Sequence, residues 1–162
     1  MMEWHIKRFS ELTADEIYDI LELRSKVFVL EQNCPYQDVD GADKRSYQLF
    51  GCEPDGTLAG CLRILDKGQT FEETAIGRVA VEESLRGRGY ARQMMERALE
   101  FAAHTLGEQV ISISAQVYLV DFYKSLGFTA VSESYLEDGI PHLDMKWKGP
   151  QDIQAEPLLT QL

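Results

Sequence analysis

Glycines and arginines alternate in one turn of the sequence, Arg86-Gly87-Arg88-Gly89, directly before a segment with helical periodicity. The N-terminus of a helix presents unpaired backbone N–H groups and a partial positive charge. Glycine lets the backbone turn sharply and approach a ligand, because no Cβ stands in the way. The nearby arginines, Arg92 among them, add positive potential. This combination is typical of a site that binds a phosphate or pyrophosphate group.

The same turn also has a purely structural interpretation. A glycine-rich connection between a strand and a helix, with solvated arginines, needs no ligand. Other phosphate loops fit poorly: Gly87-x-Gly89-x-x-Arg92 lacks the third glycine of a dinucleotide fingerprint. The G-K-[S/T] sequence of a Walker loop does not occur in the chain. A structural turn and a pyrophosphate site are therefore the two interpretations to separate.

The turn is flanked by segments of strand and helix character. Residues 75–81 form an apolar run that predicts a strand. Residues 110–115 alternate apolar side chains with serine, which predicts a second strand. Because a strand, a crossover helix and a strand form a βαβ unit, we expect the two strands to be parallel. A helix is predicted over 89–105, with one face formed by Ala91, Met94, Met95, Ala98, Phe101 and Ala102.

The rest of the chain predicts antiparallel strands around that unit. A capping box, Thr13-x-x-Glu16, begins a helix that continues to Phe28, and a polar loop follows over 36–45. The predicted fold class is therefore α/β, of the mixed α+β kind, with a mostly antiparallel sheet and helices on both faces. The remaining elements are strands over 4–9, 47–52, 58–65, 128–135 and 142–148, and a short helix over 117–126 that ends at Gly127.

Domain organisation follows from the absence of repeats and linkers in the sequence. We expect a single domain over residues 1–148 and a polar tail over 149–162.

Composition limits the classes of partner. The 162-residue chain is 44% hydrophobic and 27% charged, as globular domains are, and its formal net charge is −11. This acidic balance disfavours nucleic acid and anionic membranes, and no apolar run approaches the roughly 20 residues of a membrane helix. The first residues lack the pattern of a secretion signal. Cys34, Cys52 and Cys61 show no C-x-x-C spacing, which indicates reduced thiols in a cytoplasmic protein.

Two further sets of residues have metal-binding types without metal-binding spacing. Asp38-x-Asp40-Gly41-x-Asp43 lacks the glycine and glutamate positions of an EF-hand, so we interpret it as an ordinary acidic loop. His5 and His104 show no ligand spacing and are interpreted as structural or exposed. We therefore expect no metal site.

Two motifs in register resemble those of the GNAT superfamily, the acyl-CoA-dependent N-acetyltransferases. The run Arg86 to Ala91 fits the R/Q-x-x-G-x-G/A pattern of that superfamily. Downstream, the run Asp121 to Phe128 resembles its F-Y-x-x-x-G-F element at the matching separation. The predicted order of strands and helices also matches the superfamily's fold.

Within the superfamily, the chain resembles the ElaA-type acetyltransferases. This likeness covers roughly residues 3–148. The runs that carry it are 24–32 (RSKVFVLEQ), 34–36 (CPY) and 137–142 (EDGIPH).

The resemblance implies where acetyl-CoA, the cosubstrate, would bind. Its pyrophosphate would lie on the backbone N–H groups of the turn, and its pantetheine arm would pair with the preceding strand. GNAT sheets expose that strand edge because their two parallel strands splay apart. Gln116 stands where many members have Asn; glutamine keeps the donor and acceptor but adds a methylene. The implied cofactor-binding residues are Val79, Ala80, Val81, Arg86, Gly87, Arg88, Gly89, Tyr90, Ala91, Gln116 and Tyr123.

The resemblance also implies a catalytic residue. Tyr123 occupies the position where many members keep a general acid for the departing thiolate, although an aromatic residue that packs the helix on the sheet would look the same. Glu31 and His142 lie in segments expected to border the acceptor site, so both are candidates for the general base. A structural role for either residue, and a proton relay through water, stay open.

The function that follows is acetyl-CoA-dependent N-acetylation of a primary amine, carried by a small molecule or a protein. A noncatalytic acyl-CoA-binding sensor or interaction module on the same fold is the main alternative. A phosphate or nucleotide binder of another class is the third hypothesis. A homodimer is compatible with exposed strand edges.

Overall fold

Residues 1–149 are described by the computed structural model of the protein, and their eight strands form one sheet in the order β1-β2-β3-β4-β5-β8-β6, with β7 also paired to β8. The tail predicted over 149–162 lies, apart from Gly149, outside the described residues. The strands are β1 (Glu3–Arg8), β2 (Ser46–Cys52), β3 (Leu58–Leu65), β4 (Thr74–Val81), β5 (Val110–Gln116), β6 (Phe128–Ala130), β7 (Tyr135–Glu137) and β8 (Ile140–Lys148).

The helices begin and end close to the positions that the sequence predicts. Thr13 caps the first helix with the expected capping box, and Gly89 is the N-cap of the second. Both helices continue into a π-helical segment, over Ser25–Glu31 and Phe101–Thr105. The α-helices are α1 (Ala14–Arg24), α2 (Tyr90–Glu100) and α3 (Val120–Ser125).

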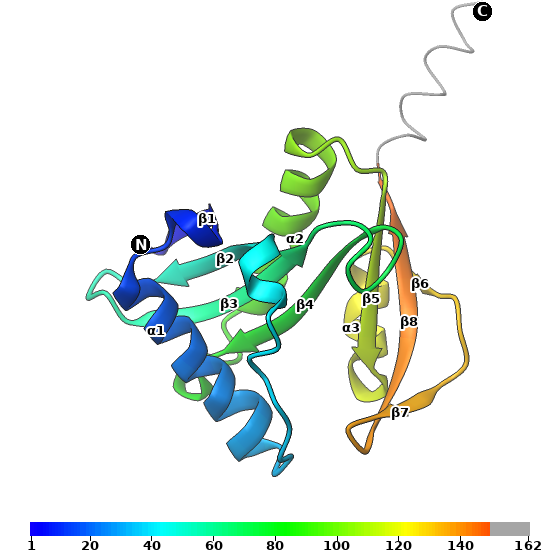
Figure 1. Ribbon diagram of the computed structural model, residues 1–162, viewed down its shortest axis with the longest axis horizontal. Helices are drawn as coiled ribbons and strands as arrows, with labels where there is room; N and C mark the ends of the chain where they lie inside the picture. The colour runs from blue at the N-terminus through cyan, green and yellow to red at the C-terminus, as the bar shows by residue number, and fades with distance from the viewer. Residues whose placement is uncertain (150–162) are drawn as a thin grey trace, which may run out of the picture.

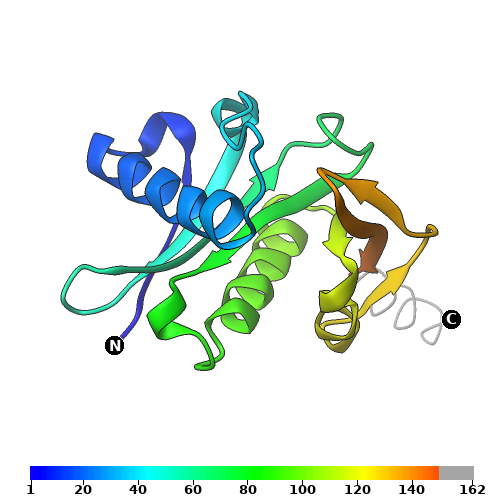
Figure 2. The same cartoon turned by 90° about the horizontal axis from the view of Figure 1, so that it is seen from below.

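The sheet separates two helical layers. Figure 1 shows α1 in front of the sheet, and the turned view of Figure 2 places α2 and α3 together on the opposite face. The larger core packs α2 and α3 against the sheet and includes Met94 and Met95. The smaller core lies under α1, where Ile20 and Leu23 meet Phe50 of β2. The predicted mixed sheet with helices on both faces is confirmed.

The parallel pair at the centre of the sheet is short. Strand β4 pairs with β5 only at Thr74–Ile111 and Ala75–Ser112. The register of β4 against β3 shifts around Arg78, whose φ of +52° is in the left-handed region. Such a bulge bends and twists the strand locally, and beyond it β4 and β5 diverge toward their C-terminal ends (Figure 1). The splay implied by the GNAT resemblance is confirmed.

The last strands differ from the prediction. The strand expected over 128–135 is two short strands, β6 and β7, separated by residues 131–134. In this gap Val131 donates its N–H to the Asp144 carbonyl, while the Ser132 hydroxyl accepts from the Asp144 N–H. The Asp144 N–H is thus bound by a side chain and not by a backbone carbonyl, so the ladder between β6 and β8 stops there. The final strand correspondingly begins at Ile140, two residues earlier than predicted.

The acidic loop is held by buried arginines. Arg24 of α1 bonds Asp38 and Asp43 at 3.0 and 2.6 Å, and Arg63 of β3 bonds Asp40 through both terminal nitrogens at 2.9 Å. Hydrogen bonding to Arg63 lowers the pKa of Asp40 against the opposing effect of burial. The loop is acidic because its carboxylates neutralise arginines that come from the helix and the sheet.

Because of this loop, the stability of the fold should depend on pH in the acidic range. Asp40 has a lower pKa in the folded state than when unfolded, so its ionised form stabilises the fold above about pH 4, the pKa of an unfolded aspartate. That stabilisation is lost as the pH falls through the lower, folded pKa. We expect Asp40→Asn to flatten the acid side of a plot of unfolding free energy against pH, measured by urea denaturation. The same acid slope in the variant and the wild type would contradict this assignment.

Candidate functional site

A cleft of about 1370 Å³ opens where β4 and β5 diverge. Its walls come from the end of the first helical segment with the loop after it, from β3 and β4 with the turn and helix start that follow, from β5 with the α3 region, and from the β7–β8 hairpin. Among the lining residues are Glu31, Tyr36, Arg78, Val79, Val81, Arg86, Gly87, Gly89, Tyr90, Ala91, Gln116, Tyr123, Tyr135, Glu137 and His142. The structure thus brings most of the residues singled out in the sequence to one place.

The glycine turn lies at one end of this cleft. Gly87 and Gly89 both have φ of +82°, and a Cβ added to either would meet no atom within 4 Å. Helix α2 begins at Gly89, whose carbonyl accepts from Gln93 N–H, so the first amides of the helix have no intrahelical acceptor. An open turn with left-handed glycines and free helix amides can bind an oxyanion group, to which the amides donate hydrogen bonds.

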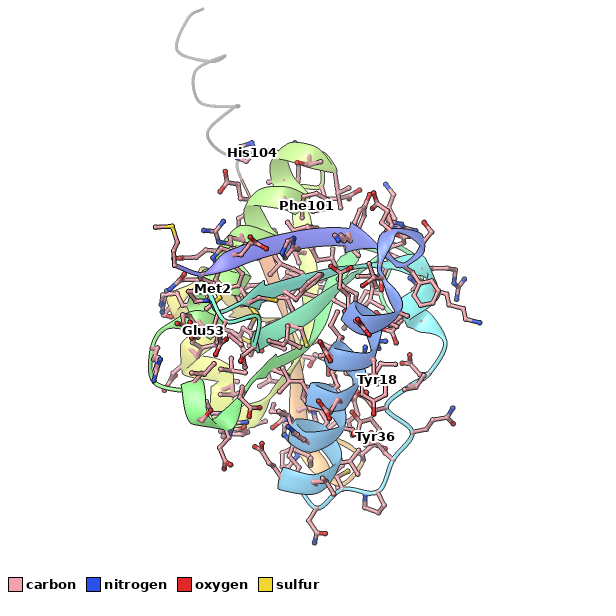
Figure 3. All side chains as sticks on the ribbon, turned by 90° about the vertical axis from the view of Figure 1, so that its left-hand side faces the viewer. Met2, Tyr18, Tyr36, Glu53, Phe101 and His104 are labelled. Carbon is pink, nitrogen blue, oxygen red and sulfur yellow. The ribbon has the colours of Figure 1, made fainter. Side chains whose placement is uncertain are left out.

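The arginines of the turn already have partners in the protein. Arg92 lies 5.7 Å from the Phe122 ring centroid and bonds Ser125 of α3. Arg88 lies 4.0 Å from Glu53 of the β2–β3 turn, and Tyr90 donates to the same carboxylate at 3.2 Å. Figure 3 shows Glu53 beside this turn. These contacts hold the arginines close to the helix N-terminus, while Arg88 remains 57% exposed.

Arg86 and Glu31 form one ion pair. The Arg86 guanidinium donates to the Glu31 carboxylate at 2.7 and 3.1 Å and to the Val81 carbonyl at 3.1 Å. The pair joins the end of the first helical segment to the end of β4 at the side of the cleft. The sequence assigned Arg86 to the cofactor and Glu31 to the acceptor, and it gave no sign that the two residues bind each other.

One edge of β4 faces the cleft without a strand partner. Ala80 and Val81 pair with β3 along the other edge, opposite Cys61 and Gly60. No ladder joins β4 to β5 beyond Ala75 within the described residues. Apart from the Val81 carbonyl, which accepts from Arg86, the cleft-side backbone groups of Val79 to Val81 are therefore available to pair with an extended ligand.

Tyr123 lies deep in the cleft wall. Its side chain is 7% exposed and packs edge-on against Phe122 and Phe128, with ring centroids 5.2 and 5.9 Å away. Burial raises the pKa of Tyr123 to about 12, so its hydroxyl stays protonated at neutral pH and can donate a hydrogen bond. Nearby, at the end of β5, the Gln116 amide reaches the Gln32 side chain at 3.5 Å.

Two cleft residues were missed by sequence reasoning. Arg78 forms an ion pair with the Asp38 carboxylate, 2.7 Å from its Nε, and donates to the Asp38 carbonyl at 3.1 Å; its guanidinium lies 5.3 Å from the Tyr36 ring centroid. Figure 3 shows Tyr36 beyond the end of α1, in the chain that leads from this helix to the sheet. Tyr36 belongs to the run 34–36 that resembles the ElaA-type family, but no role was assigned to it there. An isolated arginine within a strand carries no local pattern that could have identified Arg78.

Residues 1–149 contain no group of three or more His, Cys, Asp and Glu side chains placed to hold a metal ion. Over the same residues, no helix has the length and apolar character needed to cross a membrane.

Comparison with known proteins gives a consistent result. Residues 12–149 match the family model described as "Acetyltransferase (GNAT) domain". The chain is 43% identical over 147 residues to Protein ElaA of Escherichia coli strain K12, covering 90% of this chain and 95% of that protein. It is also 38% identical over 146 residues to a UPF0039 protein of Schizosaccharomyces pombe, covering 90% of this chain and 96% of the relative.

Solved structures show the same likeness. An acyl-CoA N-acyltransferase from Pseudomonas aeruginosa has a TM-score of 0.85 and 42% identity, over 91% of this chain and 99% of that one. The crystal structure of Escherichia coli ElaA has a TM-score of 0.85 and 41% identity, over 91% and 100% of the two chains. The AHL synthase LasI, at 18% identity and a TM-score of 0.75, shares the fold.

Proposed function

The chain belongs to the GNAT acetyltransferase family, in its ElaA-type branch, and from this premise we propose that it transfers an acetyl group from acetyl-CoA to a primary amine. The observation that carries the proposal is the cleft between β4 and β5, which joins an open glycine turn at a helix N-terminus to an unpaired strand edge. One site therefore offers donors for a diphosphate and a backbone edge for an amide-containing arm.

The residues fit acetyl-CoA group by group. The amides from Gly87 to Ala91 would hold the pyrophosphate, because both glycines leave the approach open. The edge from Val79 to Val81 would pair with the pantetheine amides as a neighbouring strand does. Gln116 lines the same cleft and offers a further side-chain amide. Arg86 would act on the turn indirectly, because it is bound to the Val81 carbonyl and to Glu31.

Acetyl-CoA supplies an acyl thioester, and the protein has to polarise it and stabilise the leaving sulfur. A neutral amine would attack the thioester carbonyl, while a backbone N–H near Val81 stabilises the developing oxyanion. The Tyr123 hydroxyl, protonated because burial raises its pKa to about 12, would donate to the departing sulfur. Its high pKa makes it a hydrogen-bond donor first and a full proton donor only as charge develops on sulfur.

The direct test is release of free thiol from acetyl-CoA, screened against a panel of primary amines. We expect saturable binding of coenzyme A and turnover with at least one amine. Absence of saturable coenzyme A binding would contradict the proposed function. Tight binding without turnover across a broad panel would instead support the noncatalytic acyl-CoA-binding module, and competition by ATP or NAD at equal affinity would support a nucleotide binder.

Tyr123→Phe removes the proposed donor with little change in shape. We expect kcat to fall by about 100-fold, at the low end of what acid–base groups contribute, with a small change in the KM for acetyl-CoA. Steady-state kinetics with the best amine of the screen would measure this. Tyr118→Phe is the matched control, because Tyr118 also lines the cleft but is 74% exposed. Equal rates for both variants would refute a catalytic hydroxyl at Tyr123.

We further infer one domain over residues 1–148 that works in the cytoplasm without a metal ion. Cys34, Cys52 and Cys61 are all free thiols, which agrees with a reducing compartment. The acceptor amine belongs to a small molecule or a protein; no nucleic acid or membrane is part of the proposal. A homodimer is likewise a proposal, tested by the mass in solution.

A further inference from the structure

An oriented histidine lies at the end of the cleft away from the glycine turn. His142 is on β8, where it is paired opposite Gln116 of β5 on one side and Tyr135 of β7 on the other. The residue is 7% exposed, and its remaining accessible surface contributes to the cleft. A buried imidazole in this position is fixed by two neighbouring strands.

The hydrogen bond of one ring nitrogen determines the tautomer. Nδ1 of His142 lies 2.7 Å from the carbonyl oxygen of Ile140. A carbonyl can only accept, so Nδ1 carries a proton, and in the neutral ring Nε2 holds the lone pair. The nearest carboxylate oxygen to Nε2 is Oε2 of Glu137 at 3.7 Å, which is longer than a hydrogen bond. Nε2 is therefore a proton acceptor whose direction is set by the backbone.

The ring plane is also held in place. Tyr135 stacks on the imidazole with a centroid distance of 6.3 Å and an interplanar angle of 22°. The Tyr135 hydroxyl in turn donates to Asp144 at 2.6 Å and contacts the Ser114 hydroxyl at 2.5 Å. The titratable groups facing the ring are thus Glu137 and Tyr135 from β7, with Asp144 acting through the Tyr135 hydroxyl, whereas Gln116 from β5 is uncharged.

We propose that His142 is the general base of the acetyl transfer and that Glu137 is its positioning partner. This assignment rests on the proposed function. Nε2 takes a proton from the ammonium group of the acceptor, and the Glu137 carboxylate stabilises both that ammonium group and the imidazolium that forms. The free amine then attacks the thioester: the C–N bond forms and the C–S bond breaks. The second nitrogen proton passes to the leaving sulfur through the Tyr123 hydroxyl, and His142 releases its proton to water.

Glu31, the other candidate, is less suited to this role. Both of its carboxylate oxygens accept from the Arg86 guanidinium, at 2.7 and 3.1 Å. Glu31 would therefore have to break this ion pair before it could take a proton from the acceptor. Glu31 instead connects the end of the first helical segment to the turn after β4.

The test variant is His142→Asn. The asparagine amide can keep a donor toward the Ile140 carbonyl, whereas the Nε2 lone pair is lost. We expect kcat/KM for the acceptor to fall by about 100-fold at pH 7. The ratio of the wild-type kcat/KM to that of the variant should shrink by up to about tenfold per pH unit as the pH rises toward the pKa of the amine. The reason is that free amine then forms without the help of a base. His104→Asn is the matched control, since His104 is exposed at the far end of the α2 helical segment (Figure 3).

Four outcomes would overturn the assignment. A wild-type rate in His142→Asn, or a loss that is the same at every pH, would overturn it, because a structural role does not depend on how much acceptor is deprotonated. If the His142→Asn protein no longer binds coenzyme A, or shows no cooperative thermal unfolding, the Glu137→Gln variant tests the assignment in its place. That variant should raise the KM for the acceptor and leave the KM for acetyl-CoA unchanged, because the Glu137 carboxylate would face the acceptor ammonium group. An unchanged KM for the acceptor would overturn the assignment. No turnover by the wild-type protein with any amine would overturn the proposed function and this base with it.

Discussion

Gly89→Val is expected to lower kcat/KM for acetyl-CoA by about 1,000-fold, mainly by weakening its binding. Gly89 has φ of +82° and is the N-cap of α2. A β-branched residue in the left-handed region costs about 1–2 kcal/mol, so the turn should change its conformation. The amides from Gly87 to Ala91 would then diverge. Losing two charge-assisted hydrogen bonds at about 2 kcal/mol each gives the stated factor.

A variant at a second glycine separates the effect of backbone strain from the effect on ligand binding. Gly107 has φ of +72°, has no atom within 4 Å of an added Cβ, and follows the opposite end of the α2 helical segment. Gly107→Val should therefore show a similar loss of thermal stability with wild-type coenzyme A affinity, measured by calorimetric titration. Equal affinities for the two variants would mean that the turn does not hold the diphosphate.

Local chemistry is what made this turn predictable from sequence. Glycine conformation, helix periodicity and the capping box at Thr13 are all properties of a few consecutive residues. The parallel pair followed from the handedness and length of one βαβ connection. The end of α3 was also predictable from the sequence, because a glycine marks it. Gly127 follows the C-cap of the helix and has φ of +101°. The elements that hold the candidate site were therefore expected before their arrangement was known.

Pairing across long separations in sequence was not predictable. Arg86 and Glu31 are 55 residues apart, and no local pattern relates them. The same holds for Arg63 and Asp40, which are 23 residues apart. The split of the predicted strand over 128–135 depends on Asp144, a residue of a later strand. In each case the tertiary fold determines the partner. The sequence therefore showed that the loop over 36–45 is acidic, but not that its carboxylates neutralise buried arginines.

Arg24→Met should reduce the free energy of unfolding by about 3–5 kcal/mol, which is typical when one partner of a buried ion pair is removed. Arg24 is 1% exposed, and it bonds the Asp38 side chain at 3.0 Å, the Asp38 carbonyl at 3.2 Å and Asp43 at 2.6 Å. Methionine fills much of the volume but leaves two carboxylates buried without that cation. Urea denaturation at pH 7 would measure the change. Arg8→Met is the control: its pair with Asp66 is 34% and 45% exposed, so about 0–1 kcal/mol is expected.

A double substitution tests whether uncompensated charge causes that loss. Asp43 accepts from Arg24, Arg63 and Gln48 through a single carboxylate oxygen, and the contact with Arg24, at 2.6 Å, is the shortest of the three. Loss of Arg24 therefore leaves the buried Asp43 charge with a weaker set of partners. Asp43→Asn in the Arg24→Met background should then be less destabilised than the sum of the single variants, with a coupling energy above about 1 kcal/mol. Additive effects would indicate that Arg24 stabilises through packing alone. A coupling energy of this size would mean that charge pairing holds the acidic loop, which carries Tyr36 to the cleft. Loss of that pairing should then raise the KM for the acceptor more than the KM for acetyl-CoA.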